Sequence, residues 1–550
     1  MSQTTEPASP EGEAAEPVQA EGAGFSSARL VGAGILLSRI AGFVRDIIFA
    51  NYLGNSGFAS AFRAALRMPN VLQNLLGEGT LSASFIPVYS RLLEKGDEEA
   101  AGRLAGAIFA LLLGVAGALS LFGVLLAPVL VSIFLTGFEG EIRDLTIACT
   151  RIIFPMTGVL VLSAWALGIL NSHRKFFVSY TAPVLWNAAM ITVLLVFGTR
   201  LDQRDLVVAL SWGALVGGAL QFLIQLPWVL RLQKGLRPRV DVKSDGVRTV
   251  VRNAGPAIMG RGVVQLSGWV DMWLASFLFA GAVAALGYAQ TLYMLPVSLF
   301  GMSIAAAELP ELSRAGSGEA EPLRRRVAAG LRQMAVFVVP SVVGYLALGD
   351  IIIGAMYERG EFARDDTVLV YLILVGYSIG LLASTATRLY SSALYALGDT
   401  KTPAKIALIR VITSAVLGGT LMMLLEPITV RGVTISLGPG VTVFGNPIGV
   451  AGLAAGTGLA AWLEWTLLRR ALGRRIGDAS AAGVLLRLVG AALIAAAAGR
   501  GLLYALPPLP LIFSLFVVMA PFGLLYFGLA SLFGVGEVRT ALARFRRRKA

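Results

Sequence analysis

Long apolar stretches separated by short polar connections run along most of the chain. A helix that crosses a lipid bilayer needs about 20 mostly apolar residues, and fourteen stretches meet that requirement. They lie near residues 28–53, 58–90, 104–134, 145–171, 176–198, 206–230, 249–278, 284–312, 327–348, 367–396, 403–425, 447–468, 483–505 and 508–533. The second stretch contains Pro69, Gly77 and Gly79, so we expect a kink there or two shorter helices. The pattern predicts an all-α membrane protein with fourteen transmembrane helices.

The amino-acid composition supports this interpretation. Of the 550 residues, 56% are hydrophobic and 14% are charged, and a soluble protein of this length has too little interior to bury so large an apolar fraction. The chain has one cysteine, Cys149, and one histidine, His173, which excludes a disulfide framework and argues against a zinc or iron–sulfur site. We therefore expect no metal and no other cofactor.

The distribution of basic residues predicts the orientation of the chain. Residues 1–24 carry five glutamates and no lysine or arginine, which is typical of a disordered tail and not of a secretory signal. If this tail is cytoplasmic, the connections on its side and the C-terminal tail hold 29 lysines and arginines, against seven on the opposite side. Because cytoplasmic loops carry an excess of basic residues, we expect both termini in the cytoplasm.

Two segments of the chain are similar to each other. Residues 42–91 and 268–314 both begin with a glycine followed closely by an aspartate, and both end in Pro-x-x-Ser-Arg. Six predicted helices separate them, so they enter the membrane in the same orientation, as in parallel repeats of transporters. Chance similarity of apolar sequence is the alternative.

The repeat predicts two six-helix lobes around a central cavity, followed by two further helices. The expected regions are a disordered tail (1–24), an N-lobe (25–230), a basic linker (231–248), a C-lobe (249–470), the last two helices (471–536) and a basic tail (537–550).

Charged residues within the first predicted helix are candidates for ligand binding. On an ideal helix Arg39 and Asp46 lie about 20° apart, and Arg45 and Gly42 lie on the same side. An ionisable group at this depth costs several kcal/mol unless it faces protein or water. An Arg–Asp pair that joins two helices is the structural alternative. Two arginines beside one acid leave a net positive charge, however, and we expect an anionic ligand to neutralise it.

The second predicted helix has one polar face. Arg63, Arg67, Asn70 and Asn74 recur at helical spacing, and Glu78 follows one turn later. We expect this face to line a wet cavity, and the alternative for Arg63 is snorkelling towards an interface. Arginine suits a diphosphate because its planar guanidinium binds two oxygens at once.

Other charges lie in the predicted C-lobe. Arg261 and Asp271 fall within the seventh helix, and Arg388 falls within the tenth. Arg261 would add to the positive cavity, whereas Asp271 and Arg388 are candidates for coupling transport to an ion or a proton.

Several motifs resemble the MurJ/MviN family of lipid II flippases. The resemblance begins at Ser38-Arg-Ile-Ala-Gly-Phe-Val-Arg-Asp46 and continues through Met68-Pro-Asn70, the stretch from Gly77 to Pro87, and Gly398-Asp-Thr-Lys-Thr-Pro403. It spans nearly the whole chain and implies fourteen helices, two lobes and alternating access. It also implies functional roles for residues of the first two helices and the tenth, namely Arg39, Arg45, Asp46, Arg67, Glu78 and Arg388.

The chain departs from this family at three places. Ser60 stands where the family has an acid, Gln73-Asn74 where it has two arginines, and Gln290-Thr291 where it has Asp-Arg. Arg63 and Arg261 lie outside the usual pattern, and we expect them to restore positive charge to the cavity.

The resemblance implies a transporter, not an enzyme. It predicts that the chain moves lipid II from the inner to the outer leaflet of a bacterial inner membrane. The alternatives are a flippase for another polyprenyl-diphosphate sugar, a cation-coupled drug exporter of the same superfamily, and a membrane glycosyl or acyl transferase. A drug exporter for cations favours an acidic cavity, and a transferase usually needs a catalytic histidine or carboxylate cluster.

The net charge of +13 raises the question of nucleic-acid binding. The basic run from Arg544 to Lys549 follows the last predicted helix, where it is typical of an anchor for anionic lipids. We expect lipid II and anionic lipids as partners, no nucleic acid, and a monomer.

Overall fold

The computed structural model describes residues 25–539, apart from 234, 237–243, 306–307, 309–311, 313–319, 431–432, 444, 480–481 and 508. Helices dominate it. They are α1 (Phe25–Leu53), α2 (Gly57–Leu76), α3 (Glu78–Ser84), α4 (Ile86–Glu94), α5 (Glu98–Leu125), α6 (Ala127–Phe134), α7 (Gly140–Ser172), α8 (Phe176–Phe197), α9 (Gln203–Leu232), α10 (Asp245–Ala275), α11 (Ala282–Pro296), the π-helix η1 (Val297–Met302), α13 (Ala320–Tyr357), α14 (Arg364–Ile379), α15 (Leu381–Ala396), α16 (Lys401–Leu425), α17 (Gly449–Ile476), α18 (Ala482–Ala505) and α19 (Leu511–Leu532).

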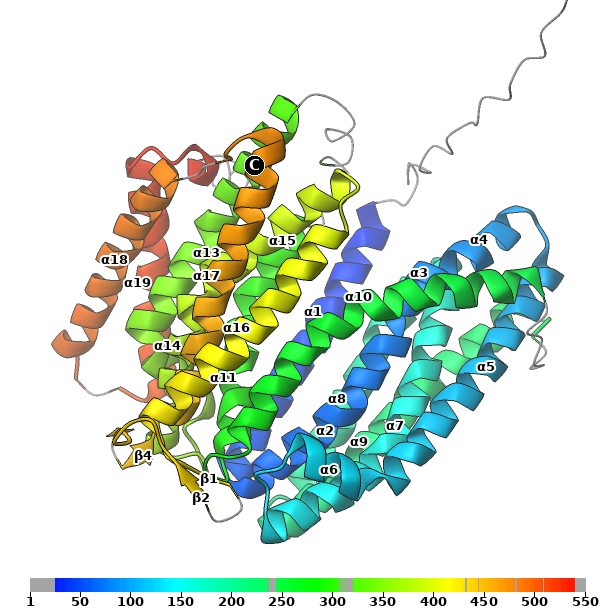
Figure 1. Cartoon of the computed structure of the whole chain (residues 1–550), viewed down its shortest axis with the longest axis horizontal. Coiled ribbons are helices and arrows are strands. Elements are labelled where there is room, and N and C mark those ends of the chain that lie inside the picture. The colour runs from blue at the N-terminus through cyan, green and yellow to red at the C-terminus, as the bar shows by residue number, and fades with distance from the viewer. Residues whose placement is uncertain are drawn as a thin grey trace, which may run out of the picture.

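The connection between α16 and α17 contains the four strands of the described chain. β1 (Ile428–Val430) pairs antiparallel with β2 (Val433–Ile435), and β3 (Thr442–Val443) pairs antiparallel with β4 (Asn446–Pro447). These two small hairpins project from one end of the helical bundle (Figure 1).

The all-α membrane fold predicted from the sequence is confirmed. Each of the fourteen predicted stretches contains one or more helices. Among the described residues, nine helices are long and apolar enough to cross a bilayer, or ten if α14 and α15, bent by 40°, form one span. The predicted interruption of the second stretch falls at Gly77, where α2 ends, whereas Pro69 is accommodated within α2.

The helices form two lobes. Helices α1–α9 pack with one another and make the N-lobe, and helices α11–α17 make the C-lobe. Helix α10 runs obliquely between the lobes, with contacts to α3 on one side and to α16 on the other (Figure 1). Helices α18 and α19 pack together on α13 at the edge of the C-lobe. The lobe boundaries predicted above remain a prediction.

The hydrophobic cores differ between the two ends of the bundle. We call the end at which α1 begins the basic end and the opposite end the junction end. At the junction end, a single cluster of buried side chains includes Phe49 and Phe62 of the N-lobe and Tyr288 of the C-lobe. At the basic end, the N-lobe has a separate cluster around Trp165, and the C-lobe has another around Leu389. The lobes therefore share a core at one end only.

Close backbone contacts also join the lobes at the junction end. The backbone N–H of Glu361 donates to the carbonyl of Asn51 over 2.9 Å. Gly54 and Gly360 have φ of 53° and 58°, which glycine adopts without strain. A Cβ at Gly54 would lie 2.3 Å from the carbonyl oxygen of Glu361. These glycines allow the two lobes to touch.

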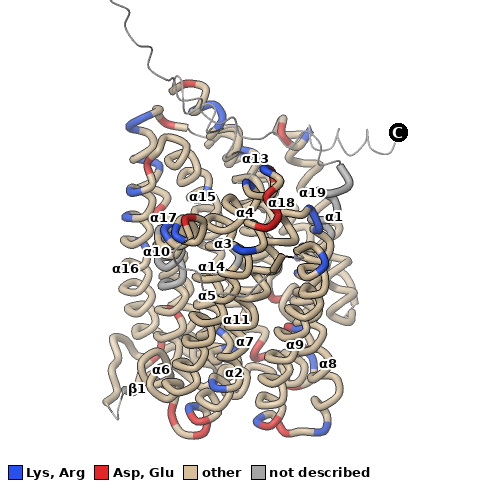
Figure 2. The backbone as a smooth tube through the Cα atoms, turned by 90° about the vertical axis from the view of Figure 1, so that its right-hand side faces the viewer, with Lys and Arg blue, Asp and Glu red and all other residues tan. Residues whose placement is uncertain are grey.

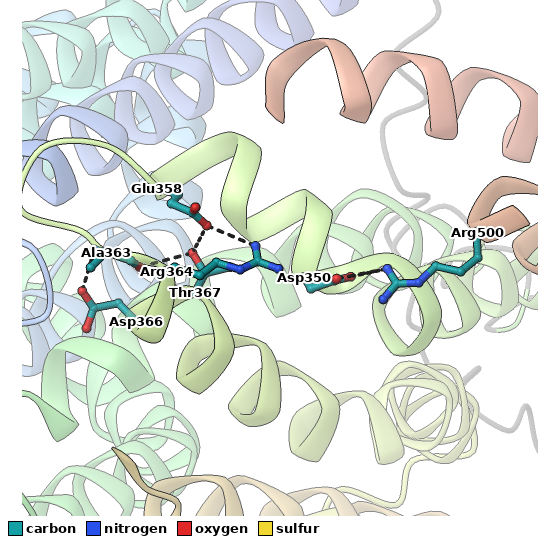
Figure 3. A network of polar contacts seen from close by, with 7 residues as sticks. All are labelled: Asp350, Glu358, Ala363, Arg364, Asp366, Thr367 and Arg500. Carbon is teal, nitrogen blue, oxygen red and sulfur yellow. Dashed lines mark hydrogen bonds and ion pairs between the residues drawn. The ribbon is translucent and has the colours of Figure 1, made fainter. Parts of the chain in front are cut away.

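An ion pair joins α18 to the C-lobe (Figure 3). Arg500 Nη1 donates to both carboxylate oxygens of Asp350, at 2.9 and 3.0 Å. Nearby, Glu358 Oε2 accepts from Arg364 over 3.2 Å and from Thr367 over 2.8 Å. Asp350 of α13 and Glu358 of the α13–α14 connection therefore tie helices together.

Charged residues lie mainly towards the two ends of the helices, and long uncharged stretches separate those ends (Figure 2). Such a distribution suits a bundle whose middle contacts hydrocarbon, because charges at bilayer depth are costly. The charges that do lie at mid-helix depth are therefore candidates for a functional site.

Candidate functional site

Arg45 is held in place by three neighbours. Its Nε and Nη2 donate to Asp46 Oδ1 over 3.2 and 2.8 Å, and its Nη1 donates to Asn187 Oδ1 over 3.1 Å. The guanidinium carbon lies 5.4 Å from the ring centroid of Trp186. Helix α1 supplies the ion pair and α8 supplies the amide and the ring, so Arg45 is preorganised and its charge is shared with Asp46.

Arg39 has a different environment. It lies at the middle of the 29-residue helix α1 and is exposed. Its Nη1 donates to Ser298 Oγ of η1 over 2.5 Å, which links the N-lobe to the C-lobe. A hydroxyl leaves the positive charge uncompensated, and lipid tails cannot solvate it. Arg39 therefore needs water or an anionic ligand.

Arg67 reaches from α2 to the C-lobe. Its Nη1 donates to Gln290 Oε1 over 3.3 Å, and Gln290 Nε2 donates to the hydroxyl of Tyr377 over 2.9 Å. A Cβ at Gly268 of α10 would lie 1.8 Å from Arg67 Nη2. The guanidinium thus occupies a notch that only glycine leaves open, and its hydrogen-bond partner is neutral.

The remaining residues of the polar face of α2 are spread along the helix. Arg63 lies at the junction end, between the rings of Phe49 and Tyr288. Asn70 is half-buried and Asn74 is exposed. The side chains of Glu78 and Arg261 lie outside the described residues.

Asp271 gathers hydroxyl groups in the C-lobe. Its side chain is buried, and Oδ1 accepts from Thr457 Oγ1 over 3.4 Å. The hydroxyls of Thr457 and Ser414 lie 2.9 Å apart. A carboxylate with two hydroxyls offers oxygen ligands of the kind that hard cations prefer, so this group can bind a cation or exchange a proton.

A second set of charges lies towards the basic end of the C-lobe. Arg410 Nη1 pairs with Glu464 Oε2 over 3.0 Å, which joins α16 to α17. Arg388, at the middle of α15, is exposed. Exposed arginines therefore occur on both lobes: Arg39 lies at the middle of α1, and Arg388 lies towards the basic end of the α14–α15 span.

Two of the three places at which the chain departs from the usual family pattern, Ser60 and Gln290-Thr291, lie where the lobes touch. Ser60 Oγ accepts from the backbone N–H of Ala284 over 3.0 Å. Thr291 Oγ1 donates to Asp46 Oδ2 over 3.1 Å, and Gln290 contacts Arg67 as described above. Hydrogen bonds made by these uncharged side chains thus join α1 and α2 to α11.

Several residues of the site were not predicted as site residues from the sequence. Ser298, Tyr377, Ser414 and Thr457 are single small or aromatic polar residues in apolar helices, and no spacing pattern distinguishes them. Their partners lie more than 100 residues away or on another helix, which the sequence pattern cannot show.

His173 has a structural environment. Its Nε2 lies 3.0 Å from the hydroxyl of Tyr89, which accepts from Gln233 Nε2 over 2.7 Å. Burial lowers the pKa of His173. Among the described residues, no three His, Cys, Asp or Glu side chains gather as a metal site would require. This network fastens the start of the linker to the N-lobe.

Comparison of the chain with known proteins identifies its relatives. The family model described as "Lipid II flippase MurJ" matches residues 49–520. The lipid II flippase MurJ of Burkholderia cenocepacia is 30% identical over 468 residues, which cover 83% of this chain and 86% of that protein. The probable lipid II flippase MurJ of Bdellovibrio bacteriovorus is 31% identical over 513 residues, which cover 91% and 93%.

Solved structures share the fold. A lipid II flippase MurJ in an inward closed conformation superimposes with a TM-score of 0.74 at 23% identity, and the match covers 92% of this chain and 98% of that one. An inward-facing multidrug transporter of the MATE family superimposes with a TM-score of 0.61 at 16% identity and covers 81% of this chain and 98% of that one.

Proposed function

Because the chain belongs to the lipid II flippase MurJ family, we propose that it carries lipid II, an undecaprenyl-diphosphate-linked peptidoglycan precursor, from the inner to the outer leaflet of the cytoplasmic membrane. Transport of an intact lipid requires no covalent step, so the protein acts as a transporter and not as an enzyme. The observation that carries this proposal within the site is Arg39, an exposed guanidinium at mid-helix depth whose partner is a neutral hydroxyl.

Three arginines of the N-lobe hold the diphosphate in this proposal. Arg39 and Arg67 have neutral hydrogen-bond partners. Arg67 also interacts with the charge of the buried Asp271, so Arg39 is the more available of the two to an anion. Arg45 is preorganised by Asn187 and can turn its guanidinium from Asp46 to a phosphate oxygen. Bidentate binding by arginine favours a diphosphate over a single charge.

Alternating access moves the bound head group. Two packed arrangements of the lobes, proposed as residues 25–230 and 249–470, would expose the site to one side of the membrane at a time. The shared core at the junction end and the separate cores at the basic end support an arrangement open at the basic end. The excess of Lys and Arg at that end supports a cytoplasmic location for it and for both termini.

Asp271 and Arg388 are the proposed coupling residues. The hydroxyls of Thr457 and Ser414 beside Asp271 support binding of a cation or a proton in the C-lobe. A net positive site also responds to the membrane potential, since moving one charge across 100 mV is worth about 2.3 kcal/mol.

Two proposals concern partners. The basic segment that follows α19 contacts anionic lipids of the cytoplasmic leaflet, because polybasic segments beside a membrane helix bind such lipids. The protein works as a monomer, because one chain supplies both lobes and every residue of the proposed site.

The test is a translocation assay with purified lipid II in proteoliposomes that contain the wild-type protein. We expect accessible lipid II to appear on the opposite leaflet faster than in protein-free vesicles. Arg39→Gln and Arg67→Gln should each lower the rate at least tenfold, which corresponds to about 1.4 kcal/mol. Arg103→Gln, a substitution of an exposed arginine paired with Glu99 at the basic end, is the matched control and should leave the rate unchanged.

The same assay separates the alternatives. If another polyprenyl-diphosphate sugar is translocated faster than lipid II, that sugar is the substrate, and the assignment of the binding site is unchanged. Equal rates with and without the protein for every polyprenyl diphosphate would contradict the proposal. Expulsion of a cationic drug, or formation of a new product from lipid II, would favour the exporter or the transferase.

A further inference from the structure

Asp46 is bonded to both lobes at once. Oδ1 of Asp46 accepts from Arg45 of the N-lobe over 2.8 Å, and Oδ2 accepts from Thr291 of the C-lobe over 3.1 Å. The residue is 7% exposed. A buried carboxylate that serves two partners cannot lose one of them without a compensating interaction.

Arg63 is an alternative partner for Asp46. It lies over the ring of Phe49, one helical turn after Asp46 on α1, and its Nη1 lies beside Gly287, whose carbonyl accepts from the same Thr291 hydroxyl that contacts Asp46. Its Nε and Nη2 are buried and have no hydrogen-bond partner among the described residues. Two guanidiniums, those of Arg45 and Arg63, therefore share one carboxylate. One of them is bonded to it and the other is not.

Arg63 in turn holds the lobes together at the junction end. Its guanidinium carbon lies 4.9 Å from the ring centroid of Phe49 on α1 and 4.3 Å from that of Tyr288 on α11. Stacking of a cation on aromatic rings is strongest where water is excluded. A Cβ at Gly287 would lie 2.7 Å from Arg63 Nη1, so the C-lobe provides a notch for this side chain.

Tyr288 extends the contact to both lobes. Its hydroxyl donates to the carbonyl of Gly54 over 2.7 Å. Its ring also lies 5.0 Å from that of Tyr357 and 5.2 Å from that of Phe362, measured between centroids. The stacked Arg63 is thus part of an aromatic cluster that closes the junction end.

We propose that Asp46 couples ligand binding to opening of the junction by exchanging one arginine for another. An anionic ligand at Arg45 draws that guanidinium away from Asp46. The uncompensated carboxylate then pairs with Arg63 through Nε and Nη2, which withdraws Arg63 from the rings of Phe49 and Tyr288. Loss of this stack separates α2 from α11, and the junction opens. Asp46 is a positioning residue, and Arg63 is a latch.

The identity of the ligand rests on the proposed function, whereas the latch does not. Its test therefore has one arm without any ligand. A cysteine replaces Ala284, which is fully buried on α11 beside Ser60, in a background that carries Cys149→Ala. The rate at which a charged, membrane-impermeant thiol reagent labels this cysteine in detergent-solubilised protein reports opening of the junction.

Without ligand, Arg63→Gln should raise the labelling rate at least fivefold. Arg63→Lys keeps the charge but lacks the planar group, and it should give a smaller increase. Arg200→Gln, at an exposed arginine of the α8–α9 connection, is the matched control and should leave the rate unchanged. A thermal unfolding curve for each variant verifies that it is folded. An Arg63→Gln protein that is folded and labelled at the wild-type rate would overturn the latch.

Purified lipid II provides the second arm. It should raise the labelling rate of the Ala284→Cys protein severalfold and should have no effect after Asp46→Asn, because the exchange then has no carboxylate. An equal response to lipid II with and without Asp46→Asn would overturn the role of Asp46. If lipid II fails to bind the parent protein at all, the proposed function fails, and the result of the first arm still decides the latch.

Discussion

The two ends of this bundle differ in how the lobes pack. At the junction end, side chains of both lobes share one core, and glycines such as Gly54 allow backbone contact between lobes. At the basic end, each lobe buries its own side chains, and the exposed Arg39 lies at mid-helix depth between the two ends. Because each lobe has its own core at the basic end, the lobes can separate there. The shared core at the junction end can then act as the hinge.

The comparison predicts different consequences for equivalent core substitutions. Phe85→Ala removes a fully buried ring from the N-lobe cluster at the basic end, whereas Phe62→Ala removes a buried ring from the shared cluster. Each should lower the free energy of unfolding by about 3–5 kcal/mol. Only Phe62→Ala should also change the distance between the lobes, as measured with spin labels. A lobe displacement by Phe85→Ala alone would contradict the comparison.

Gly54→Ala should lower the free energy of unfolding less than the core substitutions do. The new methyl group would lie 2.3 Å from the carbonyl oxygen of Glu361 in the other lobe, and a positive φ costs a residue other than glycine about 1–2 kcal/mol. We expect the junction to open and transport of lipid II to slow at least tenfold.

Gly140→Ala is the matched control for that substitution. Gly140 has nearly the same φ, 52°, and a Cβ there would meet no described atom within 4 Å. Gly140→Ala should lower the free energy of unfolding through backbone strain but should not change the position of the lobes. Equal effects of the two substitutions on transport would show that strain, and not contact between the lobes, is responsible.

Acids at the two ends should respond to pH in opposite directions. Burial raises the pKa of Glu426 at the junction end to about 7, and its Oε2 accepts from the backbone N–H of Gly449 over 3.1 Å. Because its pKa is raised, the folded protein favours the protonated form of Glu426. Protonated Glu426 therefore stabilises the fold fully at a pH below the pKa of the unfolded state, and this stabilisation is lost as pH rises through about 7. At the basic end, a hydrogen bond from the Thr402 backbone N–H lowers the pKa of Asp399. The ionised form of Asp399 therefore stabilises the fold, and this stabilisation is lost as pH falls.

Thermal unfolding between pH 5 and pH 8 measures this difference. Wild type should lose about 2 kcal/mol relative to Glu426→Gln over that interval, because the amide does not titrate. Asp399→Asn should have the same pH dependence as wild type in this interval, since the pKa of Asp399 lies below it. Parallel curves for wild type and Glu426→Gln would contradict the assignment.

The smallest predicted effect concerns the last two helices. Arg500→Ala breaks the pair with Asp350 that ties α18 to α13, but the arginine side chain is 39% exposed. Such pairs contribute about 0.5–1 kcal/mol at most. Helices α18 and α19 should remain docked through their apolar cluster on α13. Their release, seen as protease cleavage between α17 and α18, would show that the ion pair matters more than the cluster.

The sequence predicted the helices well because a membrane helix is a local pattern. Fourteen apolar stretches were sufficient to place them, and Gly77 was recognised as an interruption. The pattern could not show that α14 and α15 bend by 40° or that α10 contacts both lobes. Both features depend on packing between helices that are distant in sequence.

The candidate site was predictable only in part. Charges within apolar helices stand out, and this pattern predicts Arg39, Arg45, Asp46 and Arg67 as site residues. Their partners are neutral residues, such as Asn187 and Ser298, and these do not stand out. The stacking of Arg63 between two rings from different helices is likewise a property of the tertiary structure.

Native mass spectrometry of the detergent-extracted protein tests the central claim most directly. The account predicts that wild-type protein retains a polyprenyl-diphosphate sugar with the mass of lipid II, and that the double variant Arg39→Gln, Arg67→Gln does not. Equal retention of that lipid by both proteins would contradict the claim that these mid-helix arginines bind the diphosphate.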